Sequence, residues 1–124
     1  MTNFSKGSNR TYLIQVTDKA TGNPEPLSDW DNIHVILCDV KEITNFKDYS
    51  ITAGNLSIHD STNGWLKLII NEADIAAIPE TLRVHYVTKL IKADADYTTG
   101  NDVKAIDPIY LFTVQKFPGH GINE

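Results

Sequence analysis

The chain has 124 residues, of which 41% are hydrophobic and 22% are charged, and its formal net charge is −5. These values are typical of one globular domain with its own core, and they exclude a disordered chain. The acidic balance disfavours nucleic acid as a partner, because Lys and Arg must neutralise phosphates there. No apolar run approaches the ~20 residues that span a bilayer. The sequence therefore predicts neither a nucleic-acid partner nor a membrane partner.

Both ends of the chain are polar. Residues 1–10 are predicted to be a flexible N-terminal arm, residues 11–116 a folded domain, and residues 117–124 a C-terminal tail. The first residues lack the apolar segment of a secretory signal. Cys38 is the only cysteine, so no disulfide can form within the chain, and it is predicted to be a buried core thiol. These features predict a protein that folds in a reducing cytosol.

The first half of the chain predicts two strands and one segment that stays open. Residues 11–17 alternate apolar and polar side chains, which indicates a half-buried strand, and the Gly- and Pro-containing residues 18–26 end it. Residues 32–40 are apolar on both faces, which is typical of a central strand. Within residues 39–50, apolar side chains recur every three residues, a spacing that fits one helical turn or an irregular edge strand.

A hairpin is predicted next. Residues 56–59 read as a short strand, and residues 60–64 as a turn that ends in Asn63-Gly64, a strong local hairpin signal. The strand returns over residues 64–71, with alternate leucine and isoleucine side chains on one face.

A single helical turn is predicted over residues 72–78, where Pro79 ends it. Asn71 is the candidate N-cap, and Asp74 at the third helical position resembles a capping box. A long strand follows over residues 82–92. A turn of this kind between two strands occurs in immunoglobulin-like sandwiches, where it carries the chain from one sheet to the other.

The last part of the chain predicts a polar hairpin loop over residues 93–106 and a final strand over residues 108–116. With turn signals between short strands throughout, the predicted fold is all-β, an immunoglobulin-like sandwich of about seven antiparallel strands with one short helical turn.

One loop carries a candidate metal site. Asp94, Asp96 and Asp102, together with hydroxyl side chains and a glycine, could wrap calcium, which prefers six to eight hard oxygen ligands. The spacing departs from the EF-hand loop and no bidentate glutamate closes it, so a solvated hairpin loop is the alternative interpretation, and the one favoured here.

No other pattern of catalytic or metal-binding residues stands out. The four histidines do not fall at ligand spacings, and no Gly-x-Ser-x-Gly elbow is present. The sequence predicts no enzyme and no cofactor. Trp30, Trp65 and Tyr97 are the candidates for stacking on a sugar. An exposed aromatic pair on one sheet face would favour a carbohydrate-binding module, whereas buried tryptophans would favour a structural role.

The order of these segments resembles the immunoglobulin-like N-terminal domain of phage baseplate upper proteins and related phage modules. The resemblance covers roughly residues 7–116, and Glu80-Thr81 departs from it where the family usually has a glycine after the proline. It is carried by T-D-K-A-T-G-N-P at 17–24, N-G-W-L-K-L-I-I at 63–70, A-D-I at 73–75, I-P at 78–79, L-R-V-H-Y-V at 82–87 and the strand at 110–115.

The resemblance implies a non-enzymatic structural protein of a phage virion. The first expectation is an auxiliary capsid or decoration subunit, or one that anchors a head fibre, and a baseplate or tail adaptor is the second. Either would be synthesised in the host cytoplasm, with other virion proteins as partners and the virion as its location. Self-association into a homo-oligomer stays open. A carbohydrate-binding or adhesin module is the alternative from another class.

Overall fold

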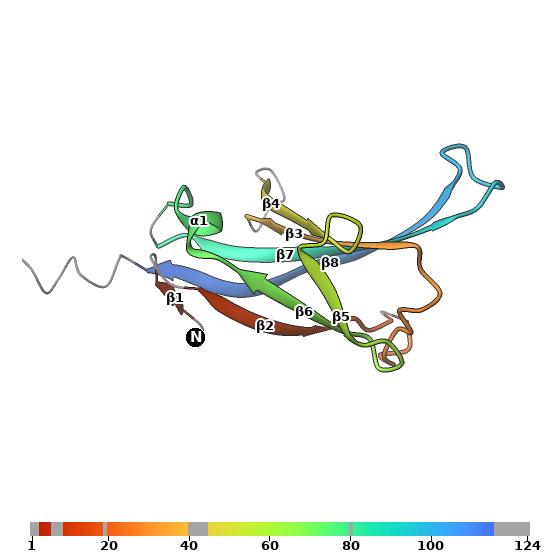
Figure 1. Cartoon of the computed structure of the whole chain (residues 1–124), viewed down its shortest axis with the longest axis horizontal. Helices are drawn as coiled ribbons and strands as arrows, with labels where there is room; N and C mark the ends of the chain where they lie inside the picture. Colours follow the sequence, from red (N-terminus) through yellow and green to blue (C-terminus); the bar gives the residue numbers. More distant parts are fainter. Residues whose placement is uncertain (1–2, 6–8, 19, 40–44, 80, 116–124) are drawn as a thin grey trace, which may run out of the picture.

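The computed structural model describes residues 3–5, 9–18, 20–39, 45–79 and 81–115. Eight strands form a five-stranded sheet in the order β1-β8-β7-β3-β4 and a three-stranded sheet in the order β2-β6-β5, with one short helix (Figure 1). The elements are β1 (Asn3–Ser5), β2 (Arg10–Gln15), β3 (Asn32–Cys38), β4 (Asn45–Ser50), β5 (Leu56–Asp60), β6 (Trp65–Ile70), α1 (Glu72–Ile75), β7 (Arg83–Ala93) and β8 (Asn101–Gln115).

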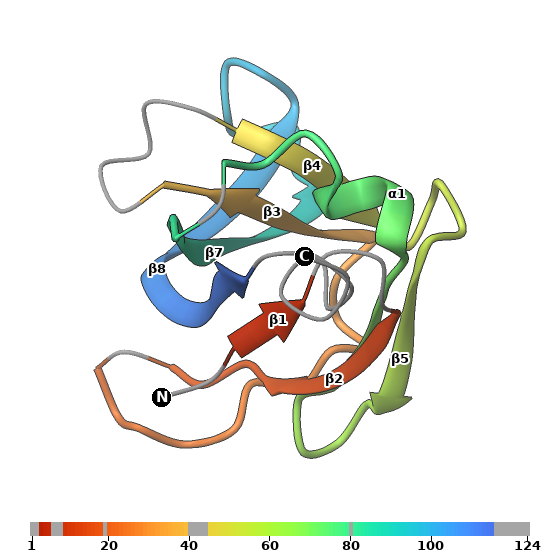
Figure 2. The same ribbon diagram turned by 90° about the vertical axis from the view of Figure 1, so that its left-hand side faces the viewer.

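The two sheets face each other, and their strand orders are those of an immunoglobulin-like sandwich (Figure 2). In that fold, strands B, E and D share one sheet and strands C, F and G share the other. Here β2, β6 and β5 occupy the first set of places and β3, β7 and β8 the second, with β4 added beside β3. The predicted all-β immunoglobulin-like sandwich is confirmed, with eight described strands where about seven were expected.

The N-terminal segment differs from the prediction of a flexible arm over residues 1–10. Asn3–Ser5 form β1, which pairs with Thr113–Gln115, and Arg10 begins β2. The β1–β8 pair is parallel, whereas the other strand pairs among the described residues are antiparallel, as expected. A three-residue edge strand is held by backbone pairing and needs no alternation of side chains, which is why the sequence gives no sign of it. The predicted tail over residues 117–124 lies outside the described residues.

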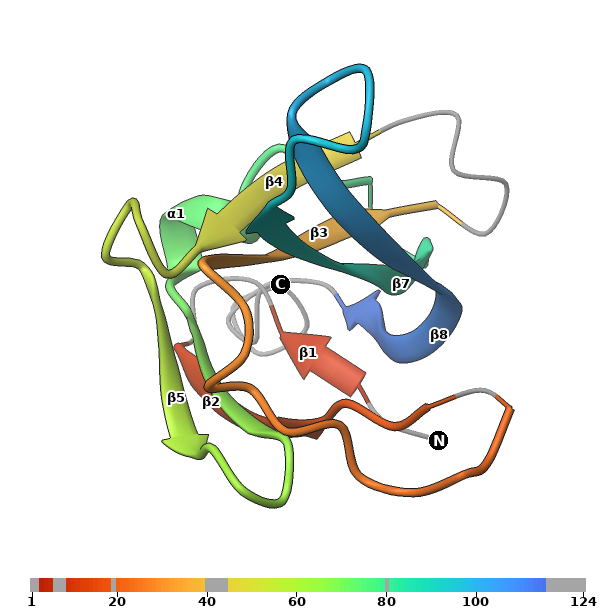
Figure 3. The same ribbon diagram turned by 90° about the vertical axis from the view of Figure 1, so that its right-hand side faces the viewer.

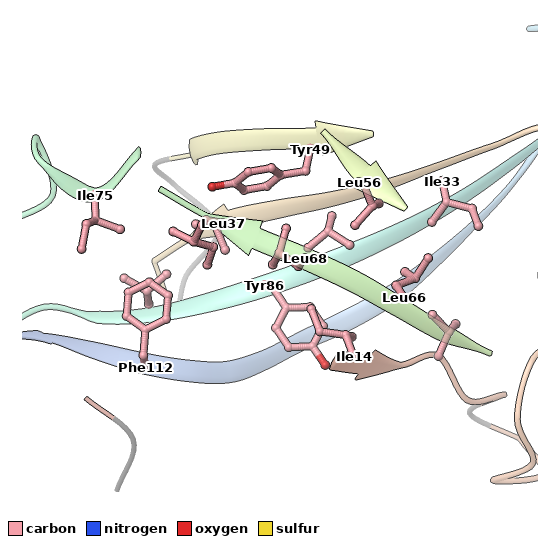
Figure 4. Packing of buried hydrophobic residues seen from close by; sticks show 14 of the residues in the cluster. Ile14, Ile33, Leu37, Tyr49, Leu56, Leu66, Leu68, Ile75, Tyr86 and Phe112 are labelled. Carbon is pink, nitrogen blue, oxygen red and sulfur yellow. The ribbon is translucent and has the colours of Figure 1, made fainter. Parts of the chain in front are cut away.

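The core lies between the two sheets, where alternate side chains of both inner faces meet (Figure 4). Leu66 and Leu68 on β6 are completely buried, as are Leu37 on β3 and Phe112 on β8. Fully burying a side chain of this kind contributes roughly 1.5–3 kcal/mol. The buried side chains of β2 and β7 complete the contact, so aliphatic and aromatic packing holds the sandwich together, and no disulfide is available.

The β5–β6 hairpin closes where Asn63-Gly64 predicted it. Gly64 has φ +75°, and a Cβ atom there would lie 2.6 Å from the carbonyl oxygen of Val16 and 2.8 Å from that of Glu25. The Val16 N–H donates to the Gly64 carbonyl oxygen at 2.8 Å. Glycine is therefore required both for the backbone conformation and for the close approach of a second chain segment.

The predicted helical turn is confirmed as α1, which closes one side of the sandwich (Figure 2). Ile75 and Ile78 bury their side chains in the core. The Asp74 carboxylate Oδ2 accepts hydrogen bonds from the Asn71 N–H at 3.1 Å and from the hydroxyl of Tyr49 at 2.8 Å. Burial and the nearby Asp74 carboxylate raise the pKa of Tyr49. One side chain thus caps the helix and fixes it to β4.

Two segments that the sequence left open or misassigned are strands. Residues 45–50 form β4, an edge strand paired with β3, and residues 40–44 lie outside the described residues. Residues 101–106 were predicted as loop but continue β8, since Ile91, Lys92 and Ala93 pair with Val103, Asp102 and Asn101. Residues 101–106 include several polar side chains because this part of the β7–β8 pair is half exposed, and in the sequence alone such a segment resembles a loop. The β7–β8 hairpin consequently extends beyond the other strands (Figure 1).

Candidate docking surfaces

The extended β7–β8 hairpin is braced on its β7 side. The Asp31 N–H donates to the carbonyl oxygen of Ile91 at 2.8 Å, and the Ala93 N–H donates to the Asp31 carboxylate at 2.7 Å. The Lys92 ammonium lies over the Trp30 ring, 5.4 Å from its centroid. The loop before β3 therefore covers this edge of β7 and holds the hairpin in place.

An ion-pair cluster holds the β8 strand of the hairpin through the side chain of Lys104. Lys104 Nζ lies 3.0 Å from Asp18 Oδ2 and also donates to the Glu25 carboxylate, both in the segment that follows β2. The hydrogen bond from Lys104 lowers the pKa of Asp18, and the bonds to Glu25 and Asp18 raise the pKa of Lys104. The cluster ties β8 to the segment between β2 and β3.

Replacing Lys104 with alanine should lower the melting temperature by a few degrees near neutral pH. The folded state depresses the Asp18 pKa, so its contribution to stability is complete above the ordinary carboxyl pKa of 3.8 and is lost as the pH falls through the lower folded value. The difference in melting temperature between Lys104→Ala and the unaltered chain should therefore shrink below about pH 4. Thermal unfolding from pH 2 to pH 7 measures it, and a difference that does not change with pH would contradict the ion-pair assignment.

The outer face of the three-stranded sheet carries large apolar side chains. On β6, Leu66, Leu68 and Ile70 point into the core, so Trp65 and Ile69 face outward. Ile69 is 46% exposed, and Leu13, which faces outward from β2, is 52% exposed. We call Leu13, Trp65 and Ile69 the β2–β6 apolar face.

These three side chains are neighbours across the sheet. Thr11 pairs with Ile69, Leu13 with Lys67, and Gln15 with Trp65, so Leu13 lies diagonally between Ile69 and Trp65. A shallow hollow of about 320 Å³ adjoins Ile69 on the β5 side. Its lining residues are Gly54, Asn55, Leu56, Ser57, Lys67, Ile69 and Asn71. The face therefore combines an apolar strip with a polar rim.

The polar contacts on the outer face of the five-stranded sheet are structural ties between strands. His34 Nδ1 lies 2.9 Å from the Asp48 carboxylate, and His34 Nε2 lies 3.2 Å from the Asn32 side-chain amide nitrogen. Both ring nitrogens are engaged, and the pair joins β3 to β4. His85 packs edge-on against Tyr110, with ring centroids 5.6 Å apart.

The predicted burial of the single cysteine is confirmed. Cys38 is 1% exposed at the end of β3, where it pairs with His85 on β7. A side chain so enclosed is unavailable to a substrate in solution.

The structure does not bring the candidate calcium ligands together. Across the described residues, no three side chains of His, Cys, Asp or Glu gather closely enough to hold a metal ion. The Asp94 carboxylate instead accepts the Asp96 N–H at 3.0 Å, inside the hairpin turn. Asp102 lies in the ladder opposite Lys92. Both contacts lie within the β7–β8 hairpin.

The candidate sugar-stacking residues come from three separate places. Trp30 is half-buried in the loop before β3 beneath Lys92, Trp65 faces outward from the start of β6, and Tyr97 is 52% exposed at the hairpin tip. None of the ring contacts found between described residues joins two of them. They do not form an exposed aromatic pair on one sheet face.

The sequence reasoning missed Leu13 and Ile69, although a signal was present. Each precedes a buried isoleucine directly, so that Leu13-Ile14 and Ile69-Ile70 place apolar side chains on both faces of their strands. In a sheet with one face in water, the outward position is normally polar. Consecutive apolar residues in such strands indicate a second, outward contact.

The fold and these surfaces define an immunoglobulin-like β-sandwich with an apolar outer sheet face and a braced, extended hairpin. No family model matches the chain, and no curated protein matches it. Within the described residues, no helix is long and apolar enough to cross a membrane.

Proposed function

We propose that this chain is a non-enzymatic structural protein of a phage virion, an auxiliary capsid or decoration subunit or one that anchors a head fibre. The observation that carries the proposal is the β2–β6 apolar face, where Leu13 and Ile69 stand half exposed on the outer side of a sheet. Burying such side chains against another protein is favourable, whereas exposing them to water is not. The resemblance of residues 7–116 to phage immunoglobulin-like modules supplies the class of partner, which is other virion proteins.

The contacts of the ionisable side chains support a non-enzymatic role. In the described part of the chain, the contacts of Lys104, His34 and Asp74 each join two different segments of the fold. None of them adjoins a nucleophilic side chain in an open cleft, which an enzyme of the acyl-transfer or hydrolytic kind would need. We therefore propose that the chain binds and does not catalyse.

The contribution of the β2–β6 apolar face to the free energy of attachment can be estimated. Fully burying an exposed leucine or isoleucine contributes roughly 1.5–3 kcal/mol, so two half-exposed side chains together contribute about the same amount. Each 1.4 kcal/mol corresponds to a tenfold change in affinity. Replacing both Leu13 and Ile69 with threonine, which is favourable in strands, should therefore weaken attachment about 10- to 100-fold.

Co-sedimentation with virions or empty capsids from the source of the chain tests this proposal. The unaltered chain should bind saturably at a fixed copy number, and the Leu13→Thr/Ile69→Thr variant should not saturate at the same concentration. Ile109→Thr is the matched control, because Ile109 is 44% exposed on β8 and outside this face. Equal binding by both variants would overturn the assignment of the surface, and absence of binding by the unaltered chain would overturn the virion proposal.

A baseplate or tail adaptor is the second candidate, on the same surface and with the same class of partner. The copy number per particle separates the two, because capsid lattices offer many more equivalent sites than a tail. Binding to a glycan column in place of particles would favour the carbohydrate-binding alternative, which requires aromatic stacking that the separated positions of Trp30, Trp65 and Tyr97 do not supply.

A further inference from the structure

Among the described residues, β1 is the only strand on the outer edge of β8, and it covers only the last three residues of that strand. β8 pairs with β7 from Asn101 to Thr113, but on its other side the described residues place only β1, opposite Thr113–Gln115 (Figure 3). Residues 101–106 of β8 thus present an edge that no described strand covers. An uncovered edge is a template on which another extended chain can pair.

The hydrogen bonds of β7 show which backbone groups of β8 point outward. The Ile91 carbonyl oxygen and the Ala93 N–H both bond to Asp31, on the side away from β8. In an antiparallel ladder, residues whose backbone groups point away from the partner strand oppose residues that do the same. Val103 opposes Ile91 and Asn101 opposes Ala93, so both direct their N–H and C=O groups to the uncovered edge.

The same alternation extends to Ala105, because the register is regular from Asn101 to Ile106. Asn101, Val103 and Ala105 are all exposed, and Val103 is 50% exposed. Pro108, which has no N–H to donate, ends the stretch that can pair. The available segment has the length of an ordinary strand. Asp31 covers the outer edge of β7, whereas no described strand pairs with the outer edge of β8 over residues 101–106.

We propose that two copies of this chain pair through this edge, with their β8 strands antiparallel and Val103 opposite Val103 of the second copy. The segment is complementary to itself in this register. Asn101 meets Ala105, and Asp102 meets Lys104, so that no like charges face each other across the two-fold axis. The Lys104 ammonium also keeps its ion pairs with Asp18 and Glu25 of its own chain. Val103 has its backbone groups directed outward, as a hydrogen-bonded pair on the axis requires, and each such pair exchanges two bonds.

Other registers are less favourable. Centring the pair on Lys104 would place two ammonium groups opposite each other, and the Lys104 backbone points toward β7 by the same alternation. Centring it on Ala105 would no longer set Asp102 opposite Lys104 and would set Lys104 against Ile106. Centring it on Asn101 would require the turn residues before β8 to extend. Val103 is therefore the position where backbone direction, side-chain charge and strand length agree.

This pairing extends the five-stranded sheet sideways and leaves the β2–β6 apolar face free, since that face belongs to the other sheet. The inference goes beyond the proposed function and does not rest on it. A dimer of this kind would present two copies of the β2–β6 apolar face to whatever each one binds.

Cysteine cross-linking tests the register directly. Hydrogen-bonded antiparallel pairs have Cα atoms about 5.5 Å apart, within the range that a disulfide bridges. Under mild oxidation, the Val103→Cys variant should therefore form a covalent dimer on a non-reducing gel. Ile69→Cys is the matched control, with 46% exposure on the other sheet, and the native Cys38 is 1% exposed. Cross-linking of Val103→Cys no greater than that of Ile69→Cys would overturn the pairing.

Solution mass gives an independent measurement. Light scattering between about 1 and 100 µM should give the mass of a dimer for the unaltered chain, and at least a tenfold weaker dimer for Val103→Lys, which puts two like charges on the axis. This variant should keep its fold, because the Val103 backbone makes no bond to β7 and its side chain faces water. A monomer at every concentration, or a dimer unaffected by Val103→Lys, would overturn the inference. Binding to particles, proposed above to depend on Leu13 and Ile69, is a separate measurement, so either proposal can fail without the other.

Discussion

Replacing Gly64 with alanine should lower the free energy of unfolding by about 3–4 kcal/mol. An L-residue at φ +75° costs roughly 1–2 kcal/mol. The new methyl group would also lie 2.6 Å and 2.8 Å from the carbonyl oxygens of Val16 and Glu25, and backbone atoms cannot rotate away as a flexible side chain can. Relief requires the hairpin to move off the segment after β2, which breaks the Val16–Gly64 hydrogen bond, worth about 1 kcal/mol.

Urea denaturation with Gly54→Ala as the matched control separates these two causes. Gly54 also has positive φ, at +83°, but a Cβ atom there would meet nothing within 4 Å. Gly54→Ala should therefore cost only the backbone term, roughly 1–2 kcal/mol. Equal losses in the two variants would mean that the close approach at Gly64 contributes nothing.

Replacing Asp74 with alanine should cost about 2–4 kcal/mol. The Tyr49 hydroxyl, on a side chain that is 1% exposed, would lose the carboxylate that accepts its hydrogen bond. A hydrogen bond to a charged group contributes roughly 1.5–3 kcal/mol, and loss of a helix cap typically costs about 1 kcal/mol. The effect is large because one side chain serves both β4 and α1.

A double-mutant cycle with Tyr49→Phe measures the first of these contributions. The coupling free energy between Asp74→Ala and Tyr49→Phe should exceed about 1 kcal/mol, because the second change removes the orphaned hydroxyl. Glu72→Ala is the control in the same helical turn, where an exposed side chain should contribute within about 0.5 kcal/mol. Additive losses would show that the two side chains act independently.

Local sequence signals predicted the parts of the fold that local interactions determine. Asn63-Gly64 located the β5–β6 turn, since few residues other than glycine adopt its backbone conformation. Asp74, with Asn71 before it and Pro79 after it, located α1, because capping and termination act within a few residues. The alternation of Leu66, Leu68 and Ile70 likewise identified the inner face of β6.

The remaining features depend on contacts between distant residues. β1 pairs with Thr113–Gln115 from the far end of the chain, and the polar first half of β8 is a strand only because β7 lies beside it. The docking surfaces depend on such pairings too. Leu13 and Ile69 become one surface because β2 and β6 are neighbours, and Val103 becomes an edge position only once β8 is known to extend to Asn101. The spacing of residues along the chain does not show which strands will lie next to each other in the sheets.

The parallel pairing of β1 with the end of β8 has a mechanical consequence. Because both strands run in the same direction, tension applied between residue 3 and residue 115 pulls them along each other in opposite senses. The hydrogen bonds between them are then loaded together in shear, whereas strands peeled apart at one end would yield one bond at a time. A force applied between these two residues therefore has to overcome all the β1–β8 hydrogen bonds at once before β1 separates from the sheet.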